Sequence, residues 1–377
     1  MTALLPFNRP SIQGRELDLL HEALSSGHWS GNGPMTQRAE AILFGMFGSD
    51  ALLTTSCTHA LELAARLVHV MPGDEVIVPA FTFMSSASAF ALCGAKPVFV
   101  DVLPGTLNLD PDALAAAITL RTSAIVTVHY AGIGDQVDRV RDIAAKHQLP
   151  LIEDNAHGLG GKYLGQPLGT FGEVSTLSFH ETKNVTCGEG GALVINDQRL
   201  TGRAEVLREK GTDRARFMRG QVDKYTWRDV GSSWVPSELL AALLVGQLEA
   251  FDRIQAGRML TWNTYRDGLA GWAEGVGARL PHVPDEAEHS AHLFYLHMQD
   301  AEQRARFIAH MRAHDVVCVF HYQALNTSPQ GWLFGGQPGQ CPVAESAADT
   351  LVRLPLFNDM TDADRTRVIE AALRFTG

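Results

Sequence analysis

Short apolar runs alternate with helix-like segments over the first 250 residues. Runs rich in Val and Ile occur at 74–80, 96–102, 123–132 and 149–158. These runs are apolar on both faces, which is typical of buried parallel strands. Between them lie segments with helical spacing of apolar residues, such as 136–147. The alternation predicts an α/β domain with a doubly wound, mostly parallel sheet.

The pattern changes near residue 250. A long helix is expected over 248–272, followed by mixed strands such as 316–322 and a final helix from about Asp362. We therefore predict a large domain over residues 1–250 and a smaller C-terminal α+β domain over residues 251–377. The first 25 or so residues are expected to pack on the smaller domain.

Composition and charge narrow the class of protein. The chain has 377 residues, 45% of them hydrophobic, which suffices for two cores. A net charge of −11 disfavours nucleic acid or an anionic membrane as a general partner. Five cysteines without a C-x-x-C pair predict reduced thiols in a cytoplasmic protein, with no metal site. The N-terminus has no signal-peptide pattern, and no run reaches the ~20 apolar residues of a membrane helix.

A lone lysine stands out in "STLSFHETKNVTCGEGGALVIND", residues 175–197. Lys183 follows an apolar strand-like run and precedes three closely spaced glycines, whose backbone can turn tightly. A desolvated lysine has a lowered pKa and is a nucleophile that forms Schiff bases with carbonyl groups. The alternative is an ordinary surface lysine before a glycine turn.

Other residues at predicted strand ends suit a cofactor. Asp154 ends the run "LPLIED", where a carboxylate can pair with a pyridinium nitrogen. Residues 54–58, "TTSCT", begin a helix and can direct backbone N–H groups at a phosphate, with Ser178 adding a hydroxyl. Phe83 can lie against a ring. Read singly, these residues also suit a helix cap or a core aromatic. Together they match the requirements of pyridoxal 5′-phosphate (PLP).

The sequence resembles the DegT/DnrJ/EryC1/StrS sugar aminotransferases. The resemblance rests on an ordered series of segments along nearly the whole chain: "SGNGPMTQRAE", "GDEVIVPAFTF", "GAKPVFVDV", "HYAG", "IEDNAHGLGGKYLGQPLGTFG", "SFHETKN" and "GEGGALVIND". It implies the type I PLP-dependent transferase fold of aspartate aminotransferase. It also implies a homodimer whose active sites take residues from both chains.

The resemblance assigns roles to individual residues. Lys183 matches the lysine that carries the cofactor, and Asp154 matches the partner of the pyridine nitrogen. Phe83 matches the stacked aromatic residue. Three further residues match phosphate-binding positions: Cys57, Thr58 and Ser178.

A second resemblance concerns the substrate. Residues 208–233 resemble those of family members that make dTDP-4-amino-4,6-dideoxy-D-galactose from dTDP-4-keto-6-deoxy-D-glucose and L-glutamate. Such members serve deoxyamino sugar biosynthesis for lipopolysaccharide O-antigen, a cell surface polysaccharide. Residues 208–228 carry seven basic and three acidic side chains, and arginine binds diphosphates and carboxylates in bidentate fashion. The expected substrate contacts are Arg214, Arg219, Lys224, Tyr225, His321 and Asn326. The alternative for the basic segment is a solvated charged loop.

The chain departs from its relatives at three positions. His157 stands where most relatives have a glutamine that bonds the cofactor's phenolic oxygen; histidine can also donate there. Val235 takes the place of an asparagine or arginine that reaches the neighbouring subunit's phosphate. Asn326 replaces a histidine common in the segment "HYQALN".

Three other functions stay open at this point. The same chemistry can give the gluco epimer, because the sequence does not determine how the sugar ring faces the cofactor. A PLP-dependent sugar dehydratase is disfavoured by Lys183, since such relatives carry histidine there. A non-catalytic sugar-nucleotide binding protein is disfavoured by the presence of both Asp154 and Lys183.

Overall fold

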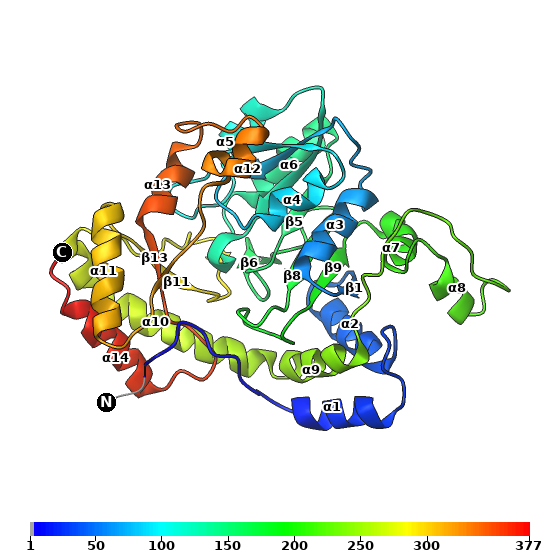
Figure 1. The fold of residues 1–377 in the computed structure, drawn as a ribbon, viewed down its shortest axis with the longest axis horizontal. Coiled ribbons are helices and arrows are strands. Elements are labelled where there is room, and N and C mark those ends of the chain that lie inside the picture. The colour runs from blue at the N-terminus through cyan, green and yellow to red at the C-terminus, as the bar shows by residue number, and fades with distance from the viewer. Residues whose placement is uncertain (1–3) are drawn as a thin grey trace.

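A seven-stranded sheet forms the centre of the computed structural model, which describes residues 4–377 (Figure 1). Its strand order is β1-β9-β8-β5-β4-β2-β3. Only β9 runs antiparallel to its neighbours within this sheet, so the predicted mostly parallel α/β sheet is confirmed. The strands are β1 (Asp50–Thr54), β2 (Glu75–Pro79), β3 (Lys96–Val100), β4 (Thr122–Val128), β5 (Leu151–Asp154), β8 (Val174–Ser178) and β9 (Gly191–Ile195).

Helices cover both faces of this sheet because its strands are apolar on both sides. In β2, Val76 and Val78 pack on one face, whereas Ile77 packs on the other. The first face is covered by α3 (Cys57–Leu67), α4 (Ser85–Ala91) and α7 (Thr201–Arg208). The second is covered by α2 (Pro34–Phe47), α5 (Pro111–Ala117), α6 (Val137–His147) and α9 (Glu238–Glu249).

A second core lies in the C-terminal part. It contains the three-stranded antiparallel sheet β11-β13-β12 and the long helix α10, the helix predicted over 248–272. Its elements are α10 (Phe251–Val276), β11 (Phe294–His297), α11 (Ala301–Ala313), β12 (Val319–Phe320), β13 (Leu351–Leu354) and α14 (Asp362–Leu373). The strand expected over 316–322 is shorter, since only Val319 and Phe320 pair with β13. The domain boundary near residue 250 remains a prediction; α9 ends and α10 begins there.

Shorter elements complete the chain. Three short strands form a separate sheet, β6 (Lys162–Tyr163), β7 (Gln166–Pro167) and β10 (Ala287–Glu288). The remaining α-helices are α1 (Glu16–Ser25), α8 (Arg214–Met218), α12 (Pro329–Leu333) and α13 (Pro342–Thr350). The 3₁₀ turns are η1 (Tyr130–Gly132), η2 (Gln198–Leu200) and η3 (Leu325–Thr327). No helix of residues 4–377 is both long and apolar enough to cross a membrane.

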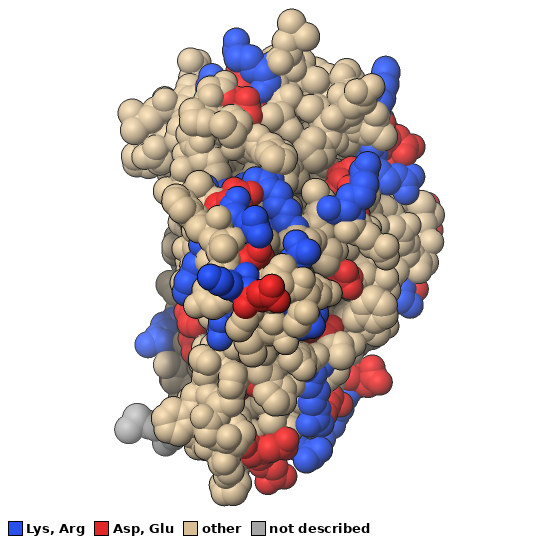
Figure 2. Space-filling view, turned by 90° about the vertical axis from the view of Figure 1, so that its right-hand side faces the viewer, with Lys and Arg blue, Asp and Glu red and all other residues tan. Residues whose placement is uncertain are grey.

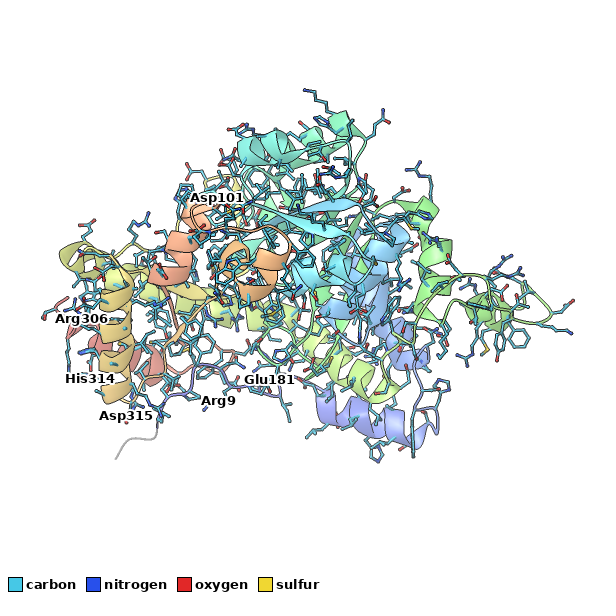
Figure 3. All side chains as sticks on the ribbon, turned by 45° about the horizontal axis from the view of Figure 1, so that its top comes forward. Arg9, Asp101, Glu181, Arg306, His314 and Asp315 are labelled. Carbon is cyan, nitrogen blue, oxygen red and sulfur yellow. The ribbon has the colours of Figure 1, made fainter. Side chains whose placement is uncertain are left out.

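The N-terminal segment runs along the smaller sheet before it reaches the large one (Figure 3). Leu5 forms a β-bridge with Val316, and the Asn8 side chain donates to the Glu181 carbonyl near Lys183. Helix α1 then packs on α9. We expected the first 25 or so residues to pack on the smaller domain. This expectation fits residues 4–9, whereas α1 packs on α9. Residues 1–3 of that segment lie outside the described residues.

Candidate active site

The carboxyl ends of the parallel strands converge on one edge of the large sheet, where such sheets bind ligands. Thr54 ends β1, Asp154 ends β5 and Ser178 ends β8. Gly191 begins the antiparallel strand β9 and pairs with both Thr54 and Ser178. The residues predicted from strand ends are thereby brought to one place in the fold.

Lys183 lies in the turn between β8 and β9. Its backbone N–H donates to the His180 carbonyl at 2.9 Å, and Gly188 follows in the left-handed region with φ of 88°. Burial is the main cause that lowers the pKa of Lys183 to about 8; the charge of Arg353 acts in the same direction, whereas Cys57 and Asp154 raise it. An amine with this pKa is neutral in a much larger fraction near neutral pH than an ordinary lysine with a pKa near ~10.4. This lysine therefore suits nucleophilic attack and proton transfer.

Asp154 is buried and held by two hydrogen bonds. Ser86 Oγ donates to Asp154 Oδ2 at 2.6 Å, and the Ala156 N–H donates to Oδ1 at 3.2 Å. Thr82 Oγ1 lies 2.8 Å from Ser86 Oγ and completes the chain of hydroxyls. Burial raises the pKa of Asp154, while these hydrogen bonds and the charge of Lys183 lower it. The carboxylate retains acceptor capacity for a further donor, such as a protonated ring nitrogen.

The start of helix α3 forms an anion cradle. Ser56 caps the helix, since its side chain accepts from the His59 N–H. The Thr58 and Ser85 hydroxyls lie 2.7 Å apart, and Cys57 Sγ lies 3.6 Å from Thr176 Oγ1. A helix N-terminus with free N–H groups and hydroxyls is a general phosphate site.

Glycine at position 191 keeps this cradle open. A Cβ on Gly191 would lie 2.4 Å from the Cys57 nitrogen, far inside contact distance. The strand that returns from the Lys183 turn can therefore pass close to the phosphate cradle only without a side chain here.

A cluster of histidine and tyrosine rings forms one wall of the candidate site. His157 and His292 stack with ring centres 4.2 Å apart, and Tyr322 Oη lies 3.5 Å from His157 Nε2. The His157 Nδ1 atom is buried and has no hydrogen-bond partner within residues 4–377. Burial lowers the pKa of His157 well below its ordinary value, so the ring is neutral. An orphaned buried ring nitrogen fits a missing polar partner, such as the cofactor's phenolic oxygen.

Phe83 and His321 also border this wall. The Phe83 ring is 49% exposed and lies 6.0 Å from the Tyr322 ring, so one of its faces is free to stack on a ligand. His321 is buried and its Nδ1 lies 2.7 Å from Tyr130 Oη.

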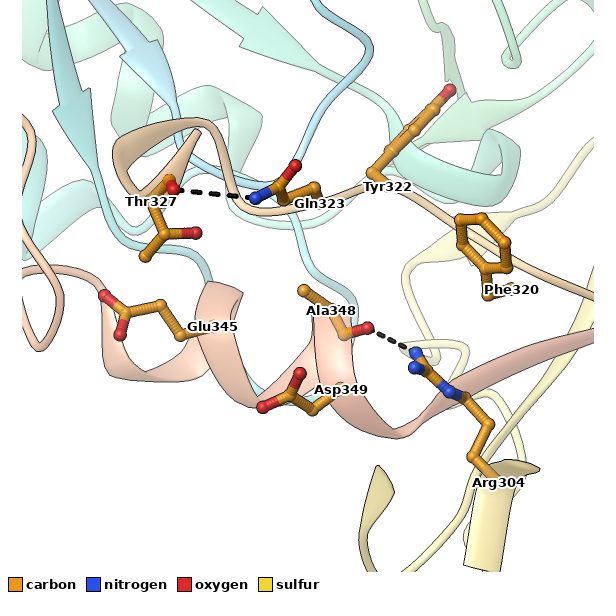
Figure 4. Close-up of a pocket in the computed structure, with 8 residues that line it drawn as sticks. All are labelled: Arg304, Phe320, Tyr322, Gln323, Thr327, Glu345, Ala348 and Asp349. Carbon is orange, nitrogen blue, oxygen red and sulfur yellow. Dashed lines mark hydrogen bonds between the residues drawn. The ribbon is translucent and has the colours of Figure 1, made fainter. Parts of the chain in front are cut away.

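A cavity of about 370 Å³ opens beside Tyr322 (Figure 4). It is lined by Arg304, Phe320, Tyr322, Gln323, Thr327, Glu345, Ala348 and Asp349.

Asn326, a predicted sugar contact, is a buried side chain. Its amide nitrogen donates to the Gln337 carbonyl and to Glu345, whereas its Oδ1 has no hydrogen-bond partner within residues 4–377. Asn326 holds the turn before α13, and its contact with the substrate stays a prediction.

Most basic side chains of residues 208–228 form ion pairs within their own chain. Helix α8 and the loop after it project from the large domain, and Figure 2 shows basic and acidic side chains mixed on that side. Arg219 forms a bidentate ion pair with Glu205, and Arg214 bonds Glu209. Lys224 has no ion pair in the described part of the chain, and Tyr225 is 50% exposed. Much of the predicted positive charge is thus neutralised locally.

His129, Glu153 and Asp101, at or next to strand ends, have structural roles. His129 bonds buried Glu153, which also accepts three backbone N–H groups from residues 169–172. Asp101 accepts from the Val343 and Ala344 N–H groups at the start of α13, beside which Figure 3 shows it. None of these carboxylates is free for ligand chemistry.

Three residues that contact or influence the site, Ser86, Tyr322 and Arg353, are not among those predicted from the sequence. Ser86 follows Thr82 by one helical turn, which offers only a weak signal. Arg353 interrupts the apolar strand "LVRLPLF", and a lone charge inside such a strand is a usable signal of a buried cation.

Fold and site together define a type I PLP-dependent transferase. The chain belongs to the DegT/DnrJ/EryC1/StrS aminotransferase family, whose model matches residues 10–373. It is a PLP-dependent sugar aminotransferase.

Solved structures support this assignment. The chain is 29% identical to the aminotransferase TlmJ from Streptoalloteichus hindustanus, with a TM-score of 0.90 and 98% of each chain covered. It is 30% identical to DesV from S. venezuelae, with a TM-score of 0.88 and coverage of 99% of this chain and 98% of DesV. Spr1654 from Streptococcus pneumoniae, a candidate sugar aminotransferase, matches in its PMP form with 28% identity, a TM-score of 0.90 and 98% of each chain covered.

The pKa of Lys183 predicts how fast apoprotein captures PLP at different pH values. The neutral amine attacks the aldehyde, so the association rate should rise with pH around a midpoint near 8. The measurement is the growth of the cofactor's absorption band after mixing, corrected with N-acetyl-lysine methylamide as the control amine. A midpoint near ~10.4, the value of an exposed lysine, would contradict a desolvated Lys183.

Proposed function

We propose that this enzyme transfers an amino group from L-glutamate to C4 of dTDP-4-keto-6-deoxy-D-glucose, giving dTDP-4-amino-4,6-dideoxy-D-galactose. The observation that carries the aminotransfer is the joint placement of Lys183, Asp154 and the α3 cradle at one sheet edge. The choice of sugar nucleotide and product is supported by the resemblance of residues 208–233. We place the enzyme in the cytoplasm, in deoxyamino sugar synthesis for O-antigen lipopolysaccharide.

The residues present fit PLP. The proposed ligands are Asp154 for the ring nitrogen, His157 for the phenolic oxygen and Phe83 for the ring face, with Cys57, Thr58 and Ser178 around the phosphate. The orphaned His157 Nδ1 and the close approach at Gly191 support this fit. When bound, PLP supplies an aldehyde that takes up the amino group and a ring that withdraws electrons from the adjacent carbon.

Lys183 is the proposed base and acid of both half-reactions. Its amine would hold the cofactor's aldehyde carbon in the resting enzyme and would be free to move protons once a substrate is bound. Because burial keeps the pKa of Lys183 near 8, its free amine can accept the proton from the donor's α-carbon. The amine then gives this proton to a different atom. In the second half-reaction the same amine delivers a proton to C4 of the sugar. The face of the sugar presented to Lys183 therefore decides between the galacto and gluco products.

The Asp154 carboxylate supplies a negative charge at the end of the proposed cofactor site opposite Lys183. A carboxylate that accepts from Ser86 and the Ala156 N–H stays ionised more readily than an unbonded buried acid. Opposite a ring nitrogen it favours the protonated ring, which is the better electron acceptor.

The product's ring protons test the proposed substrate and stereochemistry. Incubation with L-glutamate and dTDP-4-keto-6-deoxy-D-glucose should yield 2-oxoglutarate and a 4-amino sugar whose H3–H4 and H4–H5 couplings are small, as for an axial amine. NMR of the purified product measures these couplings, and Lys183→Ala serves as the inactive control. Large couplings would establish the gluco epimer, and no turnover with this sugar would overturn the substrate assignment.

We also propose a homodimer in which each active site takes residues from the partner's α8 loop. Tyr225 and Trp227 lie on that projecting loop and are 50% and 77% exposed. Exposed aromatic side chains close together are typical of interaction surfaces. Lys224, beside them, forms no ion pair within residues 4–377. A projecting loop that carries exposed aromatic side chains and a lysine without an ion pair in the described residues fits an interface.

Subunit mixing tests this shared site. We expect the double variant Lys224→Ala, Tyr225→Ala and the variant Lys183→Ala each to be inactive alone. After mixing and subunit exchange, half of the dimers are mixed and each has one intact site, so about a quarter of wild-type activity should return. Lys146→Ala, an exposed lysine on α6, is the control for the first variant. No recovery after proven exchange would show that the loop acts within its own chain.

A further inference from the structure

The side chain of His157 has almost no hydrogen bonds that would hold its ring in place. Its Nδ1 has no partner within residues 4–377, and its Nε2 lies 3.5 Å from Tyr322 Oη, at the limit of hydrogen bonding. The residue lies in the loop after β5, outside any helix or strand. A ring with such weak bonds turns about its side-chain torsions unless packing prevents it. Its orientation therefore depends on the side chains packed against it.

Among the described rings around His157, that of His292 makes the closest contact. The two ring centres lie 4.2 Å apart and the planes are 28° from parallel. The Tyr130 and His321 rings lie farther away, with centre-to-centre distances of 5.8 and 6.1 Å. Two nearly parallel rings in direct contact block each other's rotation, because a protein interior leaves no space for the swept volume. His292 is thus the main restraint on the His157 ring.

Both stacked imidazoles are neutral. Burial is the main cause that lowers the pKa of His157 and of His292 well below the ordinary value, and the charge of Lys183 acts in the same direction on both. Arg353 adds to this effect on His157, and Arg258 adds to it on His292. Because neither ring is charged, they stack without electrostatic repulsion.

Asn184 fixes the orientation of the His292 ring. Asn184 Nδ2 donates to the Ser290 carbonyl at 2.8 Å, so Asn184 Oδ1 is the acceptor that lies 2.8 Å from His292 Nδ1. A neutral His292 then carries its proton on Nδ1, since an acceptor faces that atom. The reversed amide would place Asn184 Oδ1 against the Ser290 carbonyl oxygen, and these two acceptors would repel each other. One hydrogen bond therefore sets both the orientation and the tautomer of His292.

The backbone next to this ring is tied to the loop of His157. Ser290 Oγ donates to the His157 carbonyl at 2.6 Å, and the Ser290 N–H donates to the Gly132 carbonyl at 3.0 Å. A Cβ on Gly132 would lie 1.8 Å from Ser290 Oγ, so this close approach requires glycine. Arg258 donates to the carbonyls of residues 291 and 292. The stacked ring thus rests on a segment that is fixed from both sides.

We propose that His292 is a positioning residue: held by Asn184, it keeps the His157 ring fixed for its bond to the cofactor's phenolic oxygen. This inference rests on the proposed function, because it assumes that His157 contacts PLP. Asn184 directly follows Lys183, so the turn that presents the amine and the ring that meets the phenolic oxygen share one support. An N–H donated by His157 stabilises the anionic form of that oxygen. Without this bond, the bound cofactor should release its proton at a higher pH.

The pH dependence of the cofactor's absorption tests this role. Titration of the PLP-loaded enzyme between the acid and alkaline forms of its absorption band gives a midpoint pH. His292→Gln keeps a polar side chain but removes the ring, so the midpoint should rise by about one pH unit, the order expected when a hydrogen bond to a charged oxygen is lost. His292→Phe keeps a ring and should cause less than half of that shift. His147→Gln, an exposed histidine at the end of α6, is the control and should cause none.

A double variant shows whether His292 acts through His157. His157→Ala alone should raise the midpoint at least as much as His292→Gln, and adding His292→Gln to it should bring no further shift. Additive shifts would overturn the proposal, because His292 would then act independently of His157. An unchanged midpoint in His292→Gln, or equal shifts in the Gln and Phe variants, would overturn it as well. If His292→Gln does not fold, His292→Leu, an apolar side chain without a ring, takes its place.

Crystal structures of the cofactor-free variants give a readout that needs no PLP. The His157 ring should keep its orientation in His292→Phe and should turn in His292→Gln, whereas an unmoved ring in both variants would contradict the proposal. A wild-type protein that shows no cofactor band would overturn the proposed function. These structures would still decide whether His292 positions His157, so the two failures are distinguishable.

Discussion

The site depends on burial, which lowers the pKa of one lysine, Lys183, to about 8. Lys183 is flanked by a buried carboxylate that favours its charged form and by the Arg353 guanidinium that disfavours it, and burial decides the balance. Each feature comes from a different part of the chain: Asp154 from β5, Lys183 from the β8–β9 turn and Arg353 from the smaller sheet. Asp154 and the Lys183 turn meet at the carboxyl ends of the parallel strands, where such sheets bind ligands.

The turn that carries Lys183 is tied to both cores by its neighbour Asn184. The Asn184 side chain bonds the Ser290 carbonyl and His292 Nδ1, and its carbonyl accepts from Asn358. Arg258 on α10 in turn bonds Asn358 and the carbonyls of residues 291 and 292. This network is buried and well satisfied, so it orients the lysine through rigid elements.

The sequence predicted the large sheet well because its strands repeat a simple pattern. Val- and Ile-rich runs buried on both faces are typical of parallel strands, and Asp154 lies where one of these runs ends. The small C-terminal strands were harder to place, since two- to four-residue strands such as β12 have too few residues for a period. Contacts between distant segments, such as Phe7 with Arg353 or Ser86 with Asp154, depend on tertiary packing that no local pattern encodes. The burial of Asn326 and the local ion pairs of Arg214 and Arg219 also depend on tertiary packing, so no local pattern encodes them.

The claim that Lys183 carries the cofactor is tested most directly by chemical trapping. Reduction of the PLP-loaded enzyme with borohydride converts an imine into a stable amine, and mass spectrometry of the digested protein locates the phosphopyridoxyl group. We expect this group on the peptide that contains Lys183 and on no other lysine. A label on a different lysine, or full cofactor loading with no lysine modified, would contradict it.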